Sequence, residues 1–476
     1  MEFSYGDDSP IAAYATAPGK SALTLIRCSG KGSLELAAGI FSAPEKIPQA
    51  AGNTVLHGWI VTPNKTRDRP HERADEVLIS VFRSPKSYTG EDSLDISCHG
   101  GNAAGQAVMA ALRAAGFRDA LPGEFTFRAF MNGKLDLTRA ESVMELVSAR
   151  TDRGRRNAIN RLSGVLEKEI SAIKKTLVEV LSGAEIFLDY SEDEISAVAE
   201  EIAGRLPNET LAREALTRLQ KLGKTWRMER LYQEGILAVI AGRPNSGKSS
   251  LFNLLLKEER SIVTEIPGTT RDWIEAWVSI EGIPVRLADT AGIRDDSSDP
   301  VEKIGVERSR DLLEAADLVL YLIDGEAGIT DEDVVLIDRL AMPHLVIWNK
   351  ADISSAKADA PVLTGKRLPA ISAKTGEGIA ELSSAIAAAI QTKITANAED
   401  TDPAASPSLG TVRQKNLVEA AVTALEEALN MAEKGEPLDL VSPLIREAVN
   451  SLGEITGEVS TADILEEMFS KFCVGK

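Results

Sequence analysis

Apolar residues follow different spacings in different parts of the chain. Between residues 11 and 120, short apolar runs alternate with turn residues, and residues 22–27 and 76–82 have the composition of strands. Residues 103–115 have helical spacing and are followed by Gly116, a residue type that commonly ends helices. This part of the sequence therefore predicts a small α+β domain.

From residue 137 to about residue 231 the spacing becomes helical. Leu137, Ala140, Met144 and Val147 recur at helical intervals, with charged residues between them. We expect these four side chains to share one buried helix face and the whole segment to be helical.

A third pattern begins at residues 236–240, where an apolar strand run returns, and strands then alternate with helices to about residue 390. Such alternation is typical of a doubly wound parallel sheet. Residues 396–410 are rich in Ala, Asp, Ser and Pro and predict a linker. Amphipathic spacing resumes at Val418, and helix is expected as far as Phe472.

Helical segments thus lie on both sides of the α/β part. The simplest architecture is a helical domain into which the α/β domain is inserted, and separate helical domains are the alternative. The expected bounds are 1–121 for the α+β domain, 122–231 for the first helical part, 232–392 for the α/β domain and 393–476 for the linker and second helical part.

Composition narrows the class of protein. The 476 residues allow about two to four domains, and contents of 43% hydrophobic and 26% charged residues are ordinary for a globular protein. No apolar run approaches the roughly 20 residues of a membrane span, and the acidic N-terminus lacks the features of a signal peptide. We therefore expect a cytoplasmic protein with no membrane contact.

The net charge of −19 argues against a broad nucleic-acid-binding surface, which would need clustered Lys and Arg. A local basic patch, or RNA binding through a partner, stays open, and the simplest interpretation is solubility. Three cysteines are too few and scattered for a disulfide framework or zinc cluster. Cys28 and Cys98 are expected to be buried in strands, and Cys473 to pack against a domain or line a pocket.

The first chemical motif reads Gly242-Arg-Pro-Asn-Ser-Gly247-Lys248-Ser249 and lies between a strand pattern and a helix pattern. This is the context that a P-loop requires. Its glycines allow backbone N–H groups to surround phosphates, Lys248 would reach the β- and γ-phosphates, and the Ser249 hydroxyl would coordinate Mg²⁺. A Gly-rich turn before a helix is the plain alternative, which the full eight-residue match disfavours.

Two further motifs follow the P-loop in the order that phosphate-binding switches require. Asp289-Thr-Ala-Gly292 comes after a strand pattern, so Asp289 would hold Mg²⁺ through water and the Gly292 N–H would sense the γ-phosphate. Pro267-Gly-Thr-Thr270-Arg-Asp contains the candidate switch threonine, Thr270. A plain turn at the Pro-Gly pair is the alternative for the second of these.

The last two motifs predict the base. Asn349-Lys-Ala-Asp352 follows a buried-strand pattern, and the Asp352 carboxylate can accept hydrogen bonds from the guanine N1–H and 2-amino group. Adenine lacks this pair of donors, so GTP is favoured over ATP. The Ser372-Ala-Lys374 motif would support the base from a loop.

The residue after Gly292 is Ile293, where Ras-like GTPases carry a glutamine that orients water. Isoleucine cannot do this, so the catalytic device must come from elsewhere. Asn245 could coordinate a monovalent cation beside the phosphates, supplying the charge of an arginine finger. Glu302 could position or deprotonate water, although spacing alone does not distinguish it from the other acidic residues.

The chain resembles the MnmE (TrmE) family of tRNA-modifying GTPases over essentially its full length. The P-loop, residues 262–272 and residues 301–305 carry the resemblance inside the α/β part. Outside it, Pro-Gly-Glu-Phe-Thr at 122–126, Asn-Gly-Lys-Leu-Asp-Leu at 132–137 and the terminal Cys-Val-Gly-Lys are similar to family signatures. These outer signatures are more specific than any GTPase motif.

The resemblance implies a Ras-like doubly wound GTPase domain inserted in a helical domain and preceded by a tetrahydrofolate-binding α+β domain that forms a homodimer. It implies K⁺-stimulated GTP hydrolysis with Mg²⁺, and a 5-formyl or 5,10-methylene tetrahydrofolate as one-carbon donor. It further implies a heterotetramer with the FAD-dependent MnmG (GidA) protein, which together install a carboxymethylaminomethyl-type group on the wobble uridine (U34) of tRNA. Contact with tRNA would be mainly through that partner.

The resemblance also implies roles for individual residues. Mg²⁺ would be held by Ser249 and Thr270, and Glu302 would be the catalytic carboxylate. The K⁺ ligands would be Asn245, Thr264, Ile266 and Thr269, and folate would meet Arg27, Asp95, Lys134 and Lys476. The residues expected to contact GTP are Asn245, Ser246, Gly247, Lys248, Ser249, Ser250, Thr264, Thr269, Thr270, Asp289, Thr290, Ala291, Gly292, Asn349, Lys350, Asp352, Ser372, Ala373 and Lys374.

Two departures from the family pattern affect these assignments. Asp95 stands where the family usually has a glutamate ahead of its His-Gly-Gly, and the loop between Gly292 and Glu302 is one residue longer than usual. Arg27 could instead be a solvated strand-end residue, and Lys134 a surface lysine at a helix start.

Other functions remain as alternatives. A regulatory or ribosome-assembly GTPase would share the central motifs, but such proteins usually add a basic RNA-binding module, whereas the tail here is acidic and helical. A folate-binding scaffold with a vestigial GTPase is disfavoured by the intact Lys248, Ser249, Asp289 and Asp352.

Overall fold

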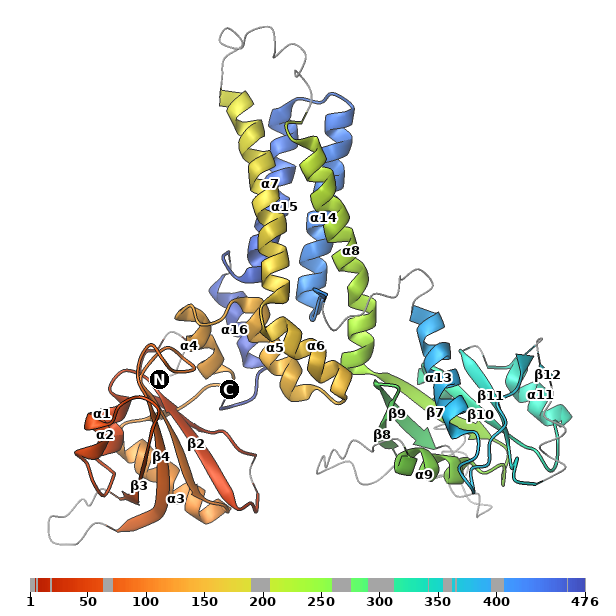
Figure 1. The fold of residues 1–476 in the computed structure, drawn as a ribbon, viewed down its shortest axis with the longest axis horizontal. Helices are drawn as coiled ribbons and strands as arrows, with labels where there is room; N and C mark the ends of the chain where they lie inside the picture. The colour runs from red at the N-terminus through yellow and green to blue at the C-terminus, as the bar shows by residue number, and fades with distance from the viewer. Residues whose placement is uncertain are drawn as a thin grey trace, which may run out of the picture. The chain divides into compact units, whose positions relative to one another are not determined.

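A computed structural model describes most of the chain (Figure 1). The described residues are Tyr5 and the ranges 7–17, 19–62, 72–189, 206–258, 275–289, 312–340, 342–353, 362–363, 366–394, 406–459 and 461–475. They divide into two compact units, the first made of residues 1–144, 170–181 and 442–476, and the second of residues 145–169 and 182–441. Within the described ranges, no helix is both long and apolar enough to cross a membrane.

A six-stranded sheet with the order β3-β4-β5-β2-β1-β6 forms the start of the first unit. Its pairs are antiparallel except β1 with β6. The strands are β1 (Ile11–Tyr14), β2 (Leu23–Ser29), β3 (Thr54–Val61), β4 (Arg73–Phe82), β5 (Ser93–His99) and β6 (Arg118–Asp119). The strand predictions at residues 22–27 and 76–82 are thus confirmed.

Helices cover one face of this sheet. They are α1 (Ser33–Ala38), α2 (Lys46–Gln49) and α3 (Asn102–Ala115), and α3 ends at a left-handed Gly116 as expected. Alternate strand residues such as Ile26, Ile79 and Ile96 pack with Leu112 of α3 in a continuous core. The period of two places the remaining strand residues on the opposite face.

That opposite face is partly open to solvent. Leu23, Val55 and Leu78 expose 59%, 60% and 48% of their surface, respectively. Arg27 and Asp95 lie opposite each other on the neighbouring strands β2 and β5. Both side chains are on this same face of the sheet. The α+β prediction for this part is confirmed.

The helices that complete the first unit are α4 (Glu124–Met131), α16 (Ala462–Ser470), most of α5 (Leu137–Ser148) and α15 (Leu438–Thr456), and the middle of α7 (Val165–Asp189). Leu137 and Ala140 pack with Phe469 in one cluster, with Met144 against it. Val147 is 46% exposed, so the prediction that it shares this buried face is wrong. The apolar face of α5 ends before its last turn.

The second unit contains a five-stranded sheet with the order β11-β10-β7-β9-β8. All neighbours are parallel except the hairpin β8–β9. The strands are β7 (Ile236–Gly242), β8 (Glu275–Ile280), β9 (Ile283–Asp289), β10 (Leu318–Asp324) and β11 (His344–Asn349), with a separate pair β12 (Val362–Leu363) and β13 (Lys366–Arg367).

Helices lie on both faces of this sheet. Ile240 packs with residues of α9 (Lys248–Glu258) and α13 (Ile379–Ile394), whereas Val239 faces Leu312 and the side of α11 (Asp331–Asp338). Since alternate residues of β7 enter different cores, the strand is buried on both faces, as a central parallel strand must be. The doubly wound prediction is confirmed.

Three further helices belong to the second unit: α6 (Asp152–Leu162), α8 (Glu209–Glu234) and α14 (Val412–Glu433). Helices α8 and α14 pack along each other, with Leu219 and Val418 fully buried. The residues preceding α14 differ from a free linker, because Leu409 is fully buried and Gly410 lies against the Glu145 carboxylate. The linker prediction therefore extends too far at its C-terminal end.

Candidate functional site

The P-loop connects β7, the central strand, to α9. Gly242 and Gly247 both have positive φ angles, of 143° and 97°. A Cβ atom on Gly247 would lie 2.2 Å from Nδ2 of Asn349, so the loop approaches the next motif too closely for any side chain. Glycine at this position is therefore required both by conformation and by space.

Lys248 is held over the loop by the backbone. Its Nζ donates hydrogen bonds to the carbonyl oxygens of Gly242 and Arg243, each over 2.9 Å. The ammonium group is thus fixed at the mouth of the loop, where the sequence predicts that it meets the β- and γ-phosphates.

Ser249, near the start of α9, contacts Asp289, the last residue of β9. The Ser249 hydroxyl donates to Oδ2 of Asp289 over 2.8 Å, and Asp289 is only 4% exposed. A hydroxyl and a buried carboxylate at one point are the hard oxygen donors that Mg²⁺ prefers. The two side chains therefore fit the Mg²⁺ that GTPases use.

Asn349 ties the base-binding loop to the P-loop. Its Nδ2 donates to the carbonyl of Ser246 over 2.8 Å, and its Oδ1 accepts from the backbone N–H of Ala373 over 2.9 Å. One buried amide thus joins three of the predicted motifs. The motifs lie together although they are far apart in the sequence.

Asp352 lies beside the Ser372-Ala-Lys374 motif. The Ser372 hydroxyl donates to Oδ1 of Asp352 over 2.9 Å, and the backbone N–H of Thr375 donates to the same hydroxyl over 3.1 Å. Ser372 is fully buried, so it fixes the orientation of the carboxylate. Asp352 is thereby set to accept from a base with two adjacent donors.

Lys350 pairs with Asp324, a residue that the sequence analysis missed. Its Nζ lies 2.5 Å from Oδ2 of Asp324 at the end of β10, and this hydrogen bond raises the pKa of Lys350. Burial alone would raise the pKa of Asp324, but hydrogen bonds from Lys350 and from the backbone of Glu326 hold that pKa below its ordinary value. The available signal was the position of Asp324 at the carboxyl end of a parallel strand.

The remaining P-loop residues differ in exposure. Asn245 is exposed and has a left-handed backbone with φ of 62°. Ser246 is fully buried, and no hydrogen-bond partner for its hydroxyl is found within the described residues. Ser250 and Lys374 are exposed at the edges of the site.

Several predicted site residues lie outside the described residues. They are Thr264, Ile266, Thr269, Thr270, Thr290, Ala291, Gly292, Glu302 and Lys476.

A second group of predicted residues lies on the first unit. Arg27 makes a two-point contact with Asp95, from Nε to Oδ1 over 2.9 Å and from Nη2 to Oδ2 over 3.2 Å. The Tyr88 ring centre lies 5.8 Å from the guanidinium carbon of Arg27. Arg27 is thus a partly buried, paired residue and not a solvated strand end.

Lys134 and the three cysteines differ in how far they are exposed. Lys134 is exposed, and its Nζ donates to the carbonyl of Pro85 over 2.9 Å. Cys28 and Cys98 are buried as predicted. Cys473 is exposed, so the prediction that it packs against a domain is wrong, and the alternative that it lines a pocket stays a prediction. The backbone of Cys473 holds the tail against Gly123, since its carbonyl accepts from the Gly123 N–H over 3.2 Å.

The P-loop, the Ser249–Asp289 pair and the Asn349–Asp352 loop, all at the carboxyl edge of a doubly wound sheet, define the class of P-loop GTPases, enzymes that bind and hydrolyse GTP. Sequence models described as "GTP-binding protein TrmE N-terminus" and "MnmE helical domain" match residues 10–134 and 137–473. The chain belongs to the MnmE (TrmE) family. The expected family and fold class are thus confirmed.

Relatives named "tRNA modification GTPase MnmE" match over their whole length. The protein from Treponema denticola is 42% identical, covering 100% of this chain and 99% of its own. That from Aquifex aeolicus is 40% identical over 98% of this chain and 99% of its own. A crystal structure of the T. maritima FeoB G domain is 30% identical over 33% of this chain and 99% of its own, with a TM-score of 0.25.

Proposed function

We propose that this GTPase is the GTP-hydrolysing component of a system that modifies the wobble uridine (U34) of tRNA with a carboxymethylaminomethyl group. The observation that carries the proposal is the extent of the family match. It includes residues 10–134 and the helical segments beyond the GTPase domain, so it is not a likeness of nucleotide motifs alone. The relatives that carry the tRNA-modification name match along 98–100% of the chain.

The nucleotide site supports hydrolysis that needs Mg²⁺ and a monovalent cation. Mg²⁺, held by Ser249 and Thr270, would neutralise phosphate charge. Asn245, an exposed P-loop residue with a left-handed backbone, offers an amide oxygen, and with Thr264, Ile266 and Thr269 it would hold K⁺ as a fixed positive charge.

Water activation is assigned to Glu302, since Ile293 cannot orient water. The other predicted contacts of the nucleotide follow the geometry of their motifs. Lys248 meets the β- and γ-phosphates, and Asp352 accepts from the guanine edge.

The first unit supports a folate site on the uncovered face of its sheet. Arg27 and Asp95 present a guanidinium and a carboxylate side by side, and the Tyr88 ring lies near the guanidinium. Such a set suits a pterin ring, which carries both donors and acceptors, and a ligand tail with carboxylates. Lys134 and Lys476 would add positive charge, and the ligand would be the 5-formyl or 5,10-methylene form of tetrahydrofolate.

The same face supports a homodimer, because Leu23, Val55 and Leu78 leave apolar surface on it. Together with the FAD-dependent MnmG protein, two chains would form a heterotetramer in the cytoplasm that holds tRNA mainly through the partner. The domain bounds that accompany this proposal are 1–121, 122–231, 232–392 and 393–476.

Deletion of the gene, followed by mass spectrometry of the nucleosides of total tRNA, tests the proposed function. Loss of the modified wobble uridine, with rescue by the wild-type gene and none by Lys248→Ala, is expected. Intact modification after deletion would contradict the proposal. A tagged protein should also recover an FAD-containing partner from the same cells.

Replacement of Na⁺ by K⁺ tests the cation assignment. The rate of GTP hydrolysis should rise in K⁺, and equal rates would rule out the cation ligands. Glu302→Ala should lower kcat by roughly 10²-fold or more with nucleotide affinity nearly intact. The exposed Glu381→Ala serves as the matched control, and its turnover should equal that of the wild type.

A further inference from the structure

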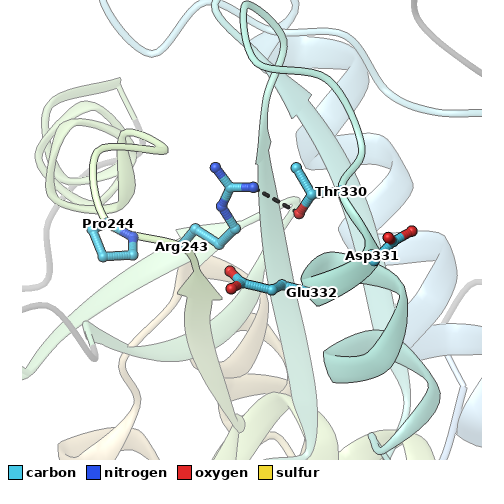
Figure 2. A pocket seen from close by; sticks show the side chains of 5 residues that line it. All are labelled: Arg243, Pro244, Thr330, Asp331 and Glu332. Atoms are coloured by element: carbon cyan, nitrogen blue, oxygen red, sulfur yellow. Dashed lines mark hydrogen bonds between the residues drawn. The ribbon is translucent and has the colours of Figure 1, made fainter.

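The side chain of Arg243, the second residue of the P-loop, is tied to the start of α11. Its Nη1 donates to Oγ1 of Thr330 over 2.6 Å and lies 3.7 Å from Oδ2 of Asp333 (Figure 2). The side chain is 29% exposed, so the contact is partly shielded from water. A charge-assisted hydrogen bond in this setting is stronger than one between neutral groups.

The anchor on α11 is itself fixed by a closed set of hydrogen bonds. Thr330 caps the helix and forms a capping box with Asp333. The Asp333 carboxylate is 2% exposed and also accepts from the Tyr321 hydroxyl of β10 over 2.9 Å. Since a buried carboxylate needs opposing charge, the guanidinium of Arg243 belongs to this cluster energetically as well as by contact.

The backbone of Arg243 has a different partner. Its carbonyl accepts a hydrogen bond from the Lys248 ammonium group over 2.9 Å. One residue thus binds α11 through its side chain and the phosphate-binding lysine through its peptide group. Because both contacts belong to one residue, holding the guanidinium against α11 also limits where the Arg243 carbonyl can lie.

We infer that Arg243 is a positioning residue for nucleotide binding, which sets the place of Lys248 through the tether to Thr330 and Asp333. The guanidinium bonds to α11 beside an open pocket of about 570 Å³, lined by Arg243, Pro244, Thr330, Asp331 and Glu332. Figure 2 shows its Thr330-bonded nitrogen directed at that helix start. Arg243 thus affects phosphate binding through Lys248, and its guanidinium does not itself contact the phosphates.

Affinity for fluorescent GDP and the kcat for GTP test the tether in full-length protein. Arg243→Ala and Thr330→Val should each weaken GDP binding by about tenfold, since each breaks the same bond. Thr330→Ser keeps the hydroxyl and the cap, so its affinity should equal that of the wild type. The double variant should bind about as weakly as either single one, because the two changes remove one interaction.

A second double-mutant cycle tests whether Arg243 affects nucleotide binding through Lys248. In the Lys248→Ala background, Arg243→Ala should cause no further loss of GDP affinity. Additive losses in either cycle, or a fall in kcat with GDP affinity intact, would overturn the positioning role. Arg243→Lys keeps a donor nitrogen and should recover part of the affinity. Binding measured well below the melting temperature of each variant separates positioning from mere stability.

Discussion

The side-chain amide of Asn349 donates a hydrogen bond to the backbone carbonyl of Ser246 over 2.8 Å, which joins the base-binding loop to the P-loop. The same amide accepts from the N–H of Ala373 over 2.9 Å. One side chain therefore holds the P-loop and the Asn349–Asp352 loop together, although the two loops follow different strands.

Removal of this amide should affect both halves of the site. Asn349→Ala leaves a buried carbonyl and a buried N–H without partners, which costs about 1–3 kcal/mol for each buried group. We expect GDP affinity to fall by at least tenfold and the free energy of unfolding to fall as well. Fluorescent-nucleotide titration and urea unfolding measure the two effects. Asn253→Ala, at an exposed position of α9, should change neither.

Base specificity should follow the chemistry at Asp352. Asp352→Asn replaces a carboxylate acceptor by an amide that also donates, so the guanine 2-amino group loses its acceptor. GTP affinity should fall by about 10²-fold or more, while xanthosine triphosphate, which carries a carbonyl at that position, should bind better than GTP. Competition between the two nucleotides measures the switch. An unchanged preference for GTP would show that Asp352 does not contact the base.

The second unit contains a buried ion cluster whose loss should destabilise it. Arg161 is 1% exposed and contacts Glu145, Glu229 and Ser408. Arg161→Ala removes the positive charge that both buried carboxylates contact, so the free energy of unfolding should fall by about 3–5 kcal/mol.

A matched control for this change is Arg156→Ala. Arg156 lies 2.7 Å from Asp152 on the same helix, but its side chain is 64% exposed. Exposed pairs of this kind contribute roughly 0–1 kcal/mol. Denaturant unfolding of both variants should separate the buried cluster from the surface pair, and equal losses would contradict the assignment.

The pair His99–Asp75 should be sensitive to pH. Nδ1 of His99 lies 2.8 Å from Oδ1 of Asp75, and this hydrogen bond raises the pKa of His99 above its ordinary 6.5. A raised pKa in the folded state means that the pair stabilises the protein fully below the unfolded value and that the contribution is lost as pH rises through the folded value.

NMR titration of the His99 ring measures this directly. The midpoint should lie above 6.5 in the wild type and move down in Asp75→Asn, which removes the charge but keeps the shape. A midpoint that does not respond to the substitution would show that Asp75 is not its cause.

Local sequence predicted the elements around the nucleotide site well. The apolar run of β7, the glycines of the P-loop and the helix that follows are consecutive in the chain, and their order alone implies their geometry. The end of α3 at Gly116 could be predicted for the same reason, since the cap and the helix are neighbours.

Contacts between distant segments were not predictable in this way. Asp324 pairs with Lys350, and Thr330 with Arg243, because the parallel register of the sheet brings those strand ends together. Nothing in the spacing of these residues indicates the pairing. The burial of Leu409 and the exposure of Cys473 likewise depend on tertiary packing, which local composition does not encode.

A single glycine, Gly235, connects the last residue of α8 to the first residue of β7. A Cβ atom there would lie 2.2 Å from the carbonyl oxygen of Pro284, so the joint admits no larger residue. Helix α8 has 26 residues and is therefore about 39 Å long, so a turn of about 5° at this joint moves its far end by about 3 Å. A small rotation about Gly235 would therefore move the far end of α8 much more than the start of β7, the strand that leads into the P-loop.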